Sequence, residues 1–257
     1  ALAWFRVNWD PDLTLGAWWQ RLAESGWGFP TWPTEWYGRD LAPHLGRVVN
    51  EARREAGVLG PPAGIAPNLA GPTLLAHGTD EQKKRFLPRI VGGEVWCQLF
   101  SEPGSGSDLA SLQTRAVRDG DEWVVNGQKV WTSGAHIARF GILVARTDPD
   151  VPKHRGLSYF VIDMHQPGIE VRPIREMTGR AIFNEVFFTD ARVPHENLVS
   201  EEGNGWSVAL TTLANERTML GAGSFGSSGS SMAIRATDPD GRVGDLVRAD
   251  DASTKRS

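Results

Sequence analysis

The apolar run Val95–Phe100 stops at a loop built almost wholly from turn-forming residues, Ser101-Glu-Pro-Gly-Ser-Gly-Ser-Asp108. Glycines let backbone N–H groups approach a ligand closely, and the hydroxyls of Ser101 and Ser107 can donate or accept hydrogen bonds. The same composition also describes a connection between strands that binds nothing. Taken alone, the loop is therefore a weak indication of a ligand site.

A second combination suited to chemistry is Glu216-Arg217, within residues 205–220, whose apolar residues have helical spacing. A glutamate can act as a general base when burial raises its pKa, and the planar guanidinium of arginine suits phosphate oxygens. The alternative for Glu216 is an intrahelical or interfacial salt bridge, the usual fate of a helical glutamate. The residues themselves leave both open.

The third combination is Trp131-Thr132-Ser133, an indole followed by two hydroxyls at the end of a β-rich run. An indole there can cover one face of an aromatic ring system, and such stacking contributes about 0.5–1.5 kcal/mol beyond burial. The chain has 11 tryptophans, and most of them are expected in cores or interfaces. Trp131 is distinguished from the other tryptophans only by the residues next to it in the sequence.

Neither a disulfide nor a metal centre is indicated. Cys97 is the only cysteine, which excludes an internal disulfide, and the six histidines show no metal-ligand spacing with it. We expect Cys97 to be a small buried hydrophobe, no structural metal, and a reducing compartment.

The elements that must position these residues change in type along the chain. In the first ninety or so residues, apolar residues recur at three- and four-residue spacing, which predicts helices. The predicted stripes are Leu13, Trp18 and Leu22, and later Leu41, Leu45, Val48 and Val49. The clearest single helix starts near residue 80, with Thr79 or Asp80 as its cap and Glu81 in its first turn.

From about Val95 the pattern becomes that of strands. Asn126-Gly127 lies between two β-rich runs and predicts a hairpin with a type I′ turn. Further strands are predicted at residues 95–100, 140–146, 157–163, 169–174 and 184–194. Turn signals about every ten residues indicate an antiparallel barrel or sandwich of about a hundred residues.

Helical spacing returns at residues 205–220, where one face is predicted to carry Trp206, Leu210, Leu213 and Leu220, interrupted by Arg217. Four glycines in the following segment, 221–231, would cost a continued helix about 4 kcal/mol relative to alanine. Residues 233–257 are polar, and we expect a poorly ordered or partner-dependent tail.

Length, composition and charge limit the classes of protein to which the chain can belong. With 257 residues the chain is long enough for one or two domains, and 40% hydrophobic residues argue against disorder throughout. The net charge of −4, from 27 basic and 31 acidic residues, gives no electrostatic footprint for nucleic acid. No run approaches the roughly 18–20 apolar residues that span a bilayer, and the first ten residues do not resemble a secretion signal. We expect a cytoplasmic protein without membrane association.

Three motifs in this order and spacing resemble those of the acyl-CoA dehydrogenase family of flavoproteins. They are LFSEPGSGSD (99–108), NGQKVWTSGAHIA (126–138) and REMTGRAIFNEVFFTDARVP (175–194). The resemblance implies an α+β, acyl-CoA dehydrogenase-like fold: an N-terminal helical domain (1–93), a central β-domain (94–203), and the start of a largely missing C-terminal helical domain with a polar tail (204–257). The chain is short for this family.

The resemblance also implies site residues. FAD would be lined by Gln98, Leu99, Phe100, Ser101, Gly106, Ser107, Trp131, Thr132 and Ser133, with Ser133 near the flavin atom that accepts hydride. Glu216 matches the position that a minority of members use for the catalytic base. Ser107, Asn215 and Arg217 would contact the acyl-CoA. The basic loop 148–155 could meet the CoA 3′-phosphate or be an exposed hairpin tip.

The implied activity is FAD-dependent α,β-dehydrogenation of an acyl-CoA thioester, with electrons passed to an electron-transferring flavoprotein and a homo- or hetero-oligomeric assembly. A flavin oxidase of the same superfamily is an alternative within the enzyme class. The alternative from another class is a non-catalytic or incomplete subunit that needs a partner to complete the FAD site, since a truncated member would expose a large apolar surface.

Overall fold

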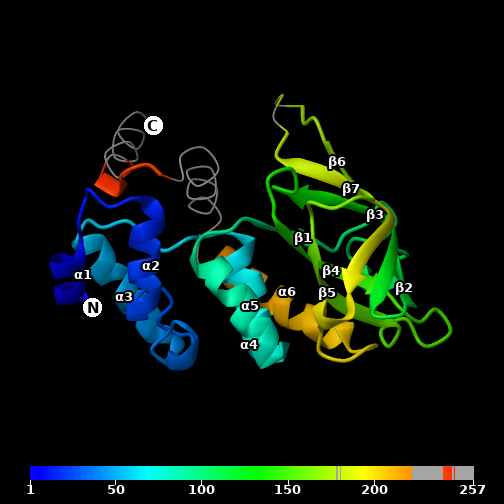
Figure 1. The fold of residues 1–257 in the computed structure, drawn as a ribbon, viewed down its shortest axis with the longest axis horizontal. Coiled ribbons are helices and arrows are strands. Elements are labelled where there is room, and N and C mark those ends of the chain that lie inside the picture. The colour runs from blue at the N-terminus through cyan, green and yellow to red at the C-terminus, as the bar shows by residue number, and fades with distance from the viewer. Residues whose placement is uncertain (178, 180, 222–239, 245, 247–257) are drawn as a thin grey trace. The chain divides into compact units, whose positions relative to one another are not determined.

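The computed structural model describes residues 1–177, 179, 181–221, 240–244 and 246 (Figure 1). They form two compact units, one of residues 1–63, 87–93 and the described part of 225–257, the other of residues 64–86 and the described part of 94–224. This division differs from the domain boundaries expected at residues 93 and 203, which remain a prediction. Among the described residues no helix is long and apolar enough to cross a membrane.

The first unit is a small helical bundle of α1 (Leu2–Asn8), α2 (Leu15–Ser25), the 3-10 turn η1 (Thr34–Trp36), α3 (Pro43–Glu55) and the last turns of α5 (Asp80–Val91). Thr14 caps α2 by accepting a hydrogen bond from Ala17 N. Trp18 and Trp19 are buried and donate their indole N–H groups to the carbonyls of Leu59 and Gly60. The helices expected from the apolar spacing are therefore confirmed.

One expectation for this unit is wrong, and another does not hold for the few tail residues that the structure describes. Leu45 and Val48, predicted to belong to a buried stripe, are exposed on α3, and of that stripe only Val49 is buried in the core. The polar tail also contributes to this core: Val243 is fully buried, and its N–H donates to the carbonyl of Leu13. The remainder of the expected tail, and the glycine-rich segment after Gly221, lie outside the described residues.

The second unit is built on a sheet with the order β6-β7-β3-β2-β4-β5-β8, to which β1 adds by pairing with β4. Its strands are β1 (Trp96–Leu99), β2 (Arg115–Asp119), β3 (Glu122–Ser133), β4 (Phe140–Arg146), β5 (Leu157–Asp163), β6 (Ile169–Pro173), β7 (Phe183–Pro194) and β8 (Leu198–Val199). The 3-10 turns η3 (Leu109–Ser111) and η4 (His195–Asn197) connect strands. Pairing is mixed rather than purely antiparallel as expected, because β1 and β2 both run parallel to β4.

The hairpin predicted at Asn126-Gly127 is also wrong. These residues lie inside the continuous strand β3, where the pairing with β7 shifts register between Val125 and Gly127. A Cβ atom on Gly127 would lie 2.7 Å from the backbone Cα of Thr114, so glycine is needed for the close approach of the segment that leads into β2 rather than for a turn. The hairpin itself turns at Gly120-Asp121, between β2 and β3, where Asp119 pairs with Glu122.

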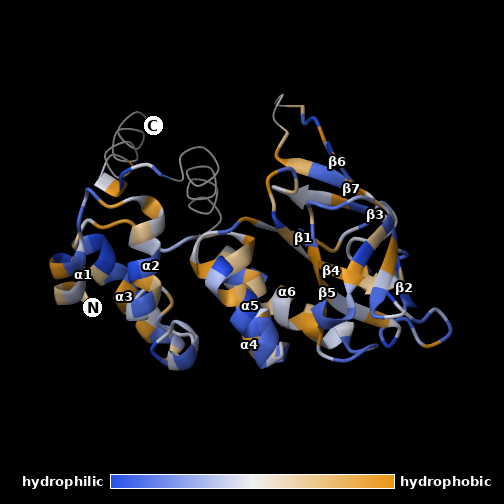
Figure 2. Cartoon of the chain, in the orientation of Figure 1, coloured by the Kyte–Doolittle hydropathy of each residue, from blue (hydrophilic) through white to orange (hydrophobic). Residues whose placement is uncertain are grey.

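Helices of the second unit are the π-helical turn η2 (Ala66–Ala70), α4 (Gly71–His77), the first turns of α5, and α6 (Gly205–Gly221). Figure 1 shows α4 beside α6, which packs on β5. α5 carries both hydrophilic and hydrophobic residues (Figure 2). Thr79 caps it, because its hydroxyl accepts from Gln82 N while the Gln82 side chain accepts from Thr79 N, which confirms one of the two predicted caps.

Candidate functional site

The Ser101–Asp108 loop begins two residues after the end of β1, and backbone hydrogen bonds close a turn within it. Glu102 and Ser105 exchange two N–H to O hydrogen bonds of 2.9 and 3.0 Å, which closes a tight turn. A Cβ atom added to Gly104 or Gly106 would meet nothing within 4 Å. Ser101 is half-buried and Ser107 exposed. The loop thus presents an open, glycine-lined surface next to two hydroxyls.

The strand residues before this loop divide into two kinds. Leu99 and Phe100 are buried, and Phe100 packs edge-on against Tyr159. Their side chains belong to the core and do not face a ligand. Gln98 is half-buried and directs its side-chain amide toward α6.

The end of β3 lies beside the same loop, since Val130 N donates to Ser101 O over 2.9 Å. Trp131 has a positive φ of 61° and is 60% exposed, a combination that a large apolar residue rarely adopts without a function. Its nearest aromatic neighbour is Phe183, in an edge contact. The structure therefore places Trp131 with its indole open to solvent next to the glycine-rich loop.

Thr132 and Ser133 complete this strand end. Thr132 is buried, its carbonyl accepts from Asn184 Nδ2 over 2.9 Å, and its hydroxyl has no hydrogen-bond partner in the described part of the chain. Ser133 is half-buried, and none of the described residues bonds its hydroxyl. Of these two hydroxyls, the one on Ser133 is the more accessible to a ligand.

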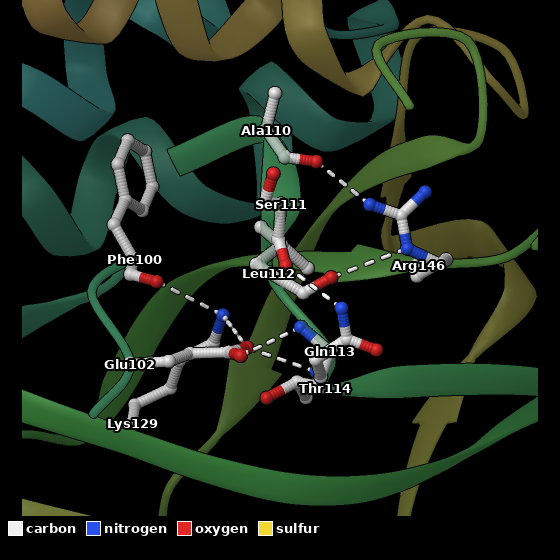
Figure 3. A network of polar contacts seen from close by, with 9 residues as sticks. All are labelled: Phe100, Glu102, Ala110, Ser111, Leu112, Gln113, Thr114, Lys129 and Arg146. Atoms are coloured by element: carbon white, nitrogen blue, oxygen red, sulfur yellow. Dashed lines mark hydrogen bonds and ion pairs between the residues drawn. The ribbon is translucent and has the colours of Figure 1, made fainter. Parts of the chain in front are cut away.

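A buried ion pair lies under the loop (Figure 3). Lys129 Nζ donates to Glu102 Oε1 over 2.9 Å and to Phe100 O over 3.0 Å, and Lys129 is 0% exposed. Complete burial lowers the pKa of Lys129 to about 8, although Glu102 opposes this shift. Burial alone would raise the pKa of Glu102, but the Lys129 ammonium and the amides of Gln113 and Thr114 together bring it below its ordinary value.

The three predicted residues of α6 differ in exposure: Asn215 and Glu216 are half-buried, and Arg217 is exposed. Glu216 Oε2 accepts a hydrogen bond of 3.3 Å from Gln98 Nε2. The structure thus joins two residues that the sequence analysis assigned separately, one to the cofactor and one to the reaction.

The face of α6 that packs inward is not the predicted one. Leu210 is 45% exposed and Trp206 and Leu213 are half-buried, whereas Val208, Ala209 and Thr212 are buried. The Thr212 hydroxyl explains this orientation, because it lies 2.8 Å from the Thr73 hydroxyl and 3.0 Å from the Tyr159 hydroxyl. Burial of this cluster raises the pKa of Tyr159 above its ordinary value.

This threonine cluster fixes the rotation of α6 about its axis and hence the direction in which Glu216, about one turn further on, points. His77 Nε2 adds a second link from α4, 2.8 Å from Thr211 Oγ1. Neither Lys129 nor Thr212 was singled out from the sequence, since both are polar residues whose partners are far away in the chain.

Two other features considered from the sequence are the basic loop 148–155 and Cys97. Lys153 of the basic loop 148–155 pairs with Asp108 Oδ1 and Oδ2 at 2.8 Å, and both side chains are largely exposed. Cys97 is fully buried, as expected, and burial raises the pKa of its thiol. No group of three or more metal-ligating side chains occurs in the part of the chain that the structure describes.

Comparisons with known proteins agree with the motifs. Residues 5–94 match the family description Acyl-CoA dehydrogenase, N-terminal domain, and residues 97–191 match Acyl-CoA dehydrogenase, middle domain. The chain is 52% identical over 203 residues to Acyl-CoA dehydrogenase FadE34 of Mycobacterium tuberculosis, covering 79% of this chain and 28% of that protein.

Two solved structures extend the comparison to the fold. A variant of the Tcur3481-Tcur3483 steroid ACAD is 32% identical with a TM-score of 0.68, covering 99% of this chain and 67% of that chain. The ChsE4-ChsE5 complex from Mycobacterium tuberculosis is 37% identical with a TM-score of 0.64, covering 78% of this chain and 51% of that chain. The chain thus spans about half or less of the length of the first curated relatives it matches.

Proposed function

The chain belongs to the acyl-CoA dehydrogenase family, and from this premise we propose that it binds FAD and takes part in α,β-dehydrogenation of an acyl-CoA thioester. The observation that carries the proposal is the hydrogen bond between Gln98 and Glu216. It brings a helical carboxylate to the strand that leads into the open glycine-rich loop.

The residues present fit a flavin. Trp131 offers an exposed indole, Gly104 and Gly106 leave open space, and the hydroxyl of Ser133 is unused within the described residues. A planar ring with polar edges requires such a combination of an aromatic face, close backbone approach and hydroxyl donors. When bound, FAD supplies the acceptor for the hydride that leaves the substrate β-carbon.

Each proposed role follows from the chemistry of a side chain. Glu216 takes the proton from the carbon next to the thioester carbonyl at one of its carboxylate oxygens. Gln98 orients that carboxylate, and Arg217, exposed on the next position of α6, binds phosphate or pantothenate oxygens of CoA together with Asn215. Backbone groups of residues 98–101 and 104–107 approach the flavin, and Ser107 lies between flavin and substrate.

The test is the visible spectrum of the purified chain with added FAD. A yellow protein that bleaches anaerobically with an acyl-CoA supports the proposal, and a chain that never retains FAD contradicts it. Octanoyl-CoA and a CoA thioester with a steroid-derived acyl group are suitable probes, the second because one similar structure is described as a steroid ACAD. Reoxidation by an electron-transferring flavoprotein against reoxidation by air separates a dehydrogenase from an oxidase.

For the base, Glu216→Gln is expected to retain FAD and lose bleaching. Glu202→Gln is a matched control, because Glu202 is exposed and precedes α6. Bleaching that survives in Glu216→Gln would place the base on another residue.

A second candidate is a subunit that completes its FAD site only with a partner. The exposure of Leu210 on α6 favours it, since an apolar side chain at 45% exposure on a helix that also carries Glu216 suggests a surface that another chain covers. Size measurement of the chain alone, followed by FAD titration of the isolated and assembled forms, distinguishes the two candidates.

A further inference from the structure

The buried pair Lys129–Glu102 is the one fully enclosed ion pair in the described part of the chain, with 0% and 7% of the two side chains exposed. Lysine and glutamate are rarely buried unless they are paired. Even a paired burial often stabilises no more than apolar residues of the same volume would. The pair therefore calls for an explanation other than net stability.

Its hydrogen bonds connect three stretches of backbone. Lys129, on β3, donates to the carbonyl of Phe100 at the end of β1. Glu102 accepts from the amides of Gln113, at 2.6 Å, and Thr114, at 2.9 Å, just before β2 begins. Figure 3 shows both side chains pointing toward each other between these stretches. Within the described residues, the polar contacts of the two charged groups are all made inside the protein, so neither group is free to touch a ligand.

The neighbours of the pair in sequence are the residues proposed to hold the flavin. Glu102 directly follows Ser101, and Lys129 lies two residues before Trp131. The backbone bond from Val130 N to Ser101 O runs beside the pair. A shift of either charged side chain would thus move the glycine-rich loop against the strand that carries Trp131.

We propose that Lys129 and Glu102 are positioning residues that hold the Ser101–Ser107 loop and the Trp131–Ser133 strand end in one fixed relative placement. The inference rests on the proposed function, because it concerns the two segments assigned to FAD. An apolar pair would fill the same volume, but it could not direct the Phe100 carbonyl and the Gln113 and Thr114 amides. Positioning to a fraction of an ångström is what a stacked ring between two segments requires.

The first measurement needs no cofactor. Amide hydrogen exchange is followed in the full chain, its Lys129→Met and Glu102→Gln variants, and Val193→Ala as a control that lowers stability from a buried position elsewhere in the sheet. Lys129→Met and Glu102→Gln, the two clamp variants, are each expected to speed exchange at Glu102, Ser105 and Val130 together by about tenfold or more, since charge-assisted hydrogen bonds are lost. Amides of β4 and β5 exchange through unfolding of the whole unit, so they should speed only as far as the loss of overall stability requires, and the excess at Glu102, Ser105 and Val130 is measured beyond that loss.

The second measurement is FAD affinity by fluorescence polarisation of the flavin. Both clamp variants are expected to bind FAD at least about tenfold more weakly, while Val193→Ala binds as the unmodified chain does. The wavelength of the absorption maximum of the bound flavin is recorded as well, because a general loss of stability would not shift it.

Three results would overturn the inference: exchange that rises uniformly over the sheet, exchange that rises in only one of the two segments, or FAD affinity that is unchanged in both clamp variants. Failure of the proposed function looks different, because then the unmodified chain binds no FAD. Hydrogen exchange still decides in that case whether the pair couples the two segments.

Discussion

The side-chain amide of Gln98, on β1, donates to the carboxylate of Glu216, on α6, over 3.3 Å. The two residues are 118 positions apart, so this contact exists only because α6 packs on the sheet. A donor on one carboxylate oxygen leaves the other oxygen for a second partner. The contact thus sets which part of Glu216 faces a substrate.

Gln98→Leu is expected to slow flavin reduction by acyl-CoA in a single turnover by about three- to tenfold with little change in FAD affinity, because a hydrogen bond to a charged group is lost. Gln128→Leu is the matched control, since Gln128 is also half-buried on a strand and donates to a carboxylate, that of Glu185, at 3.0 Å. Equal rates in the unmodified chain and Gln98→Leu would show that the contact does not orient the base.

Trp131→Ala is expected to change the free energy of unfolding by less than about 1 kcal/mol, because the indole is largely exposed. FAD affinity should fall by about threefold to tenfold as aromatic stacking is lost. Urea denaturation and flavin polarisation measure the two quantities separately. Trp123→Ala provides the contrast: that indole is buried and donates to His195 Nδ1, so we expect a loss of about 3–5 kcal/mol. A large stability loss in Trp131→Ala would make Trp131 a core residue.

The bounds of β4 and β5, two strands that are continuous apolar runs, were predicted to the residue, because the signals for them lie in the local sequence. β4 and β5 match the predicted ranges 140–146 and 157–163, since nearly every side chain in them is buried and turn residues bound both runs. The Thr79 cap was likewise predictable, because its hydrogen bonds span three residues.

Features that depend on distant partners were not predictable in the same way. The Asn126-Gly127 sequence is typical of a hairpin turn. In the structure Gly127 lies inside a strand instead, where Thr114 approaches it too closely for a side chain. The apolar spacing of α6 indicated a face through Leu210, whereas the hydroxyls of Thr73 and Tyr159 turn Thr212 inward. Burial of Lys129 likewise depends on a carboxylate 27 residues away. Each reflects tertiary contacts that override a local pattern.

Gly127→Ala is expected to destabilise the second unit by about 1–3 kcal/mol, because the new methyl group would overlap backbone and side-chain atoms of Thr114. Gly120→Ala is the control: Gly120 also has a positive φ, but a Cβ atom there meets nothing within 4 Å. Only the cost of the backbone conformation, about 1 kcal/mol, is expected for it. Chemical denaturation of both variants measures the difference, and equal losses would refute the steric explanation.

The pH dependence of stability is expected to change in Glu102→Gln. The pKa of Glu102 is lower in the folded chain than its ordinary value of 4.5, so as pH falls the unfolded chain takes up this proton first. The stabilisation is therefore complete above about pH 4.5 and is lost as pH falls through the folded pKa. Near pH 7, Glu102→Gln should cost about 3–5 kcal/mol, because Lys129 is left buried without a counter-charge.

Below pH 4.5 the free energies of unfolding of the unmodified chain and of Glu102→Gln should converge. Protonation of Glu102 removes its stabilising contribution from the unmodified chain, whereas Glu102→Gln has no such contribution to lose. Urea titrations at a series of pH values measure this convergence. Glu170→Gln is the control, since the Glu170–Arg172 pair is exposed and solvent screens it, so the free energy of unfolding is expected to stay nearly unchanged at any pH. A constant difference between the unmodified chain and Glu102→Gln from neutral to acid pH would show that folding does not lower the pKa of Glu102.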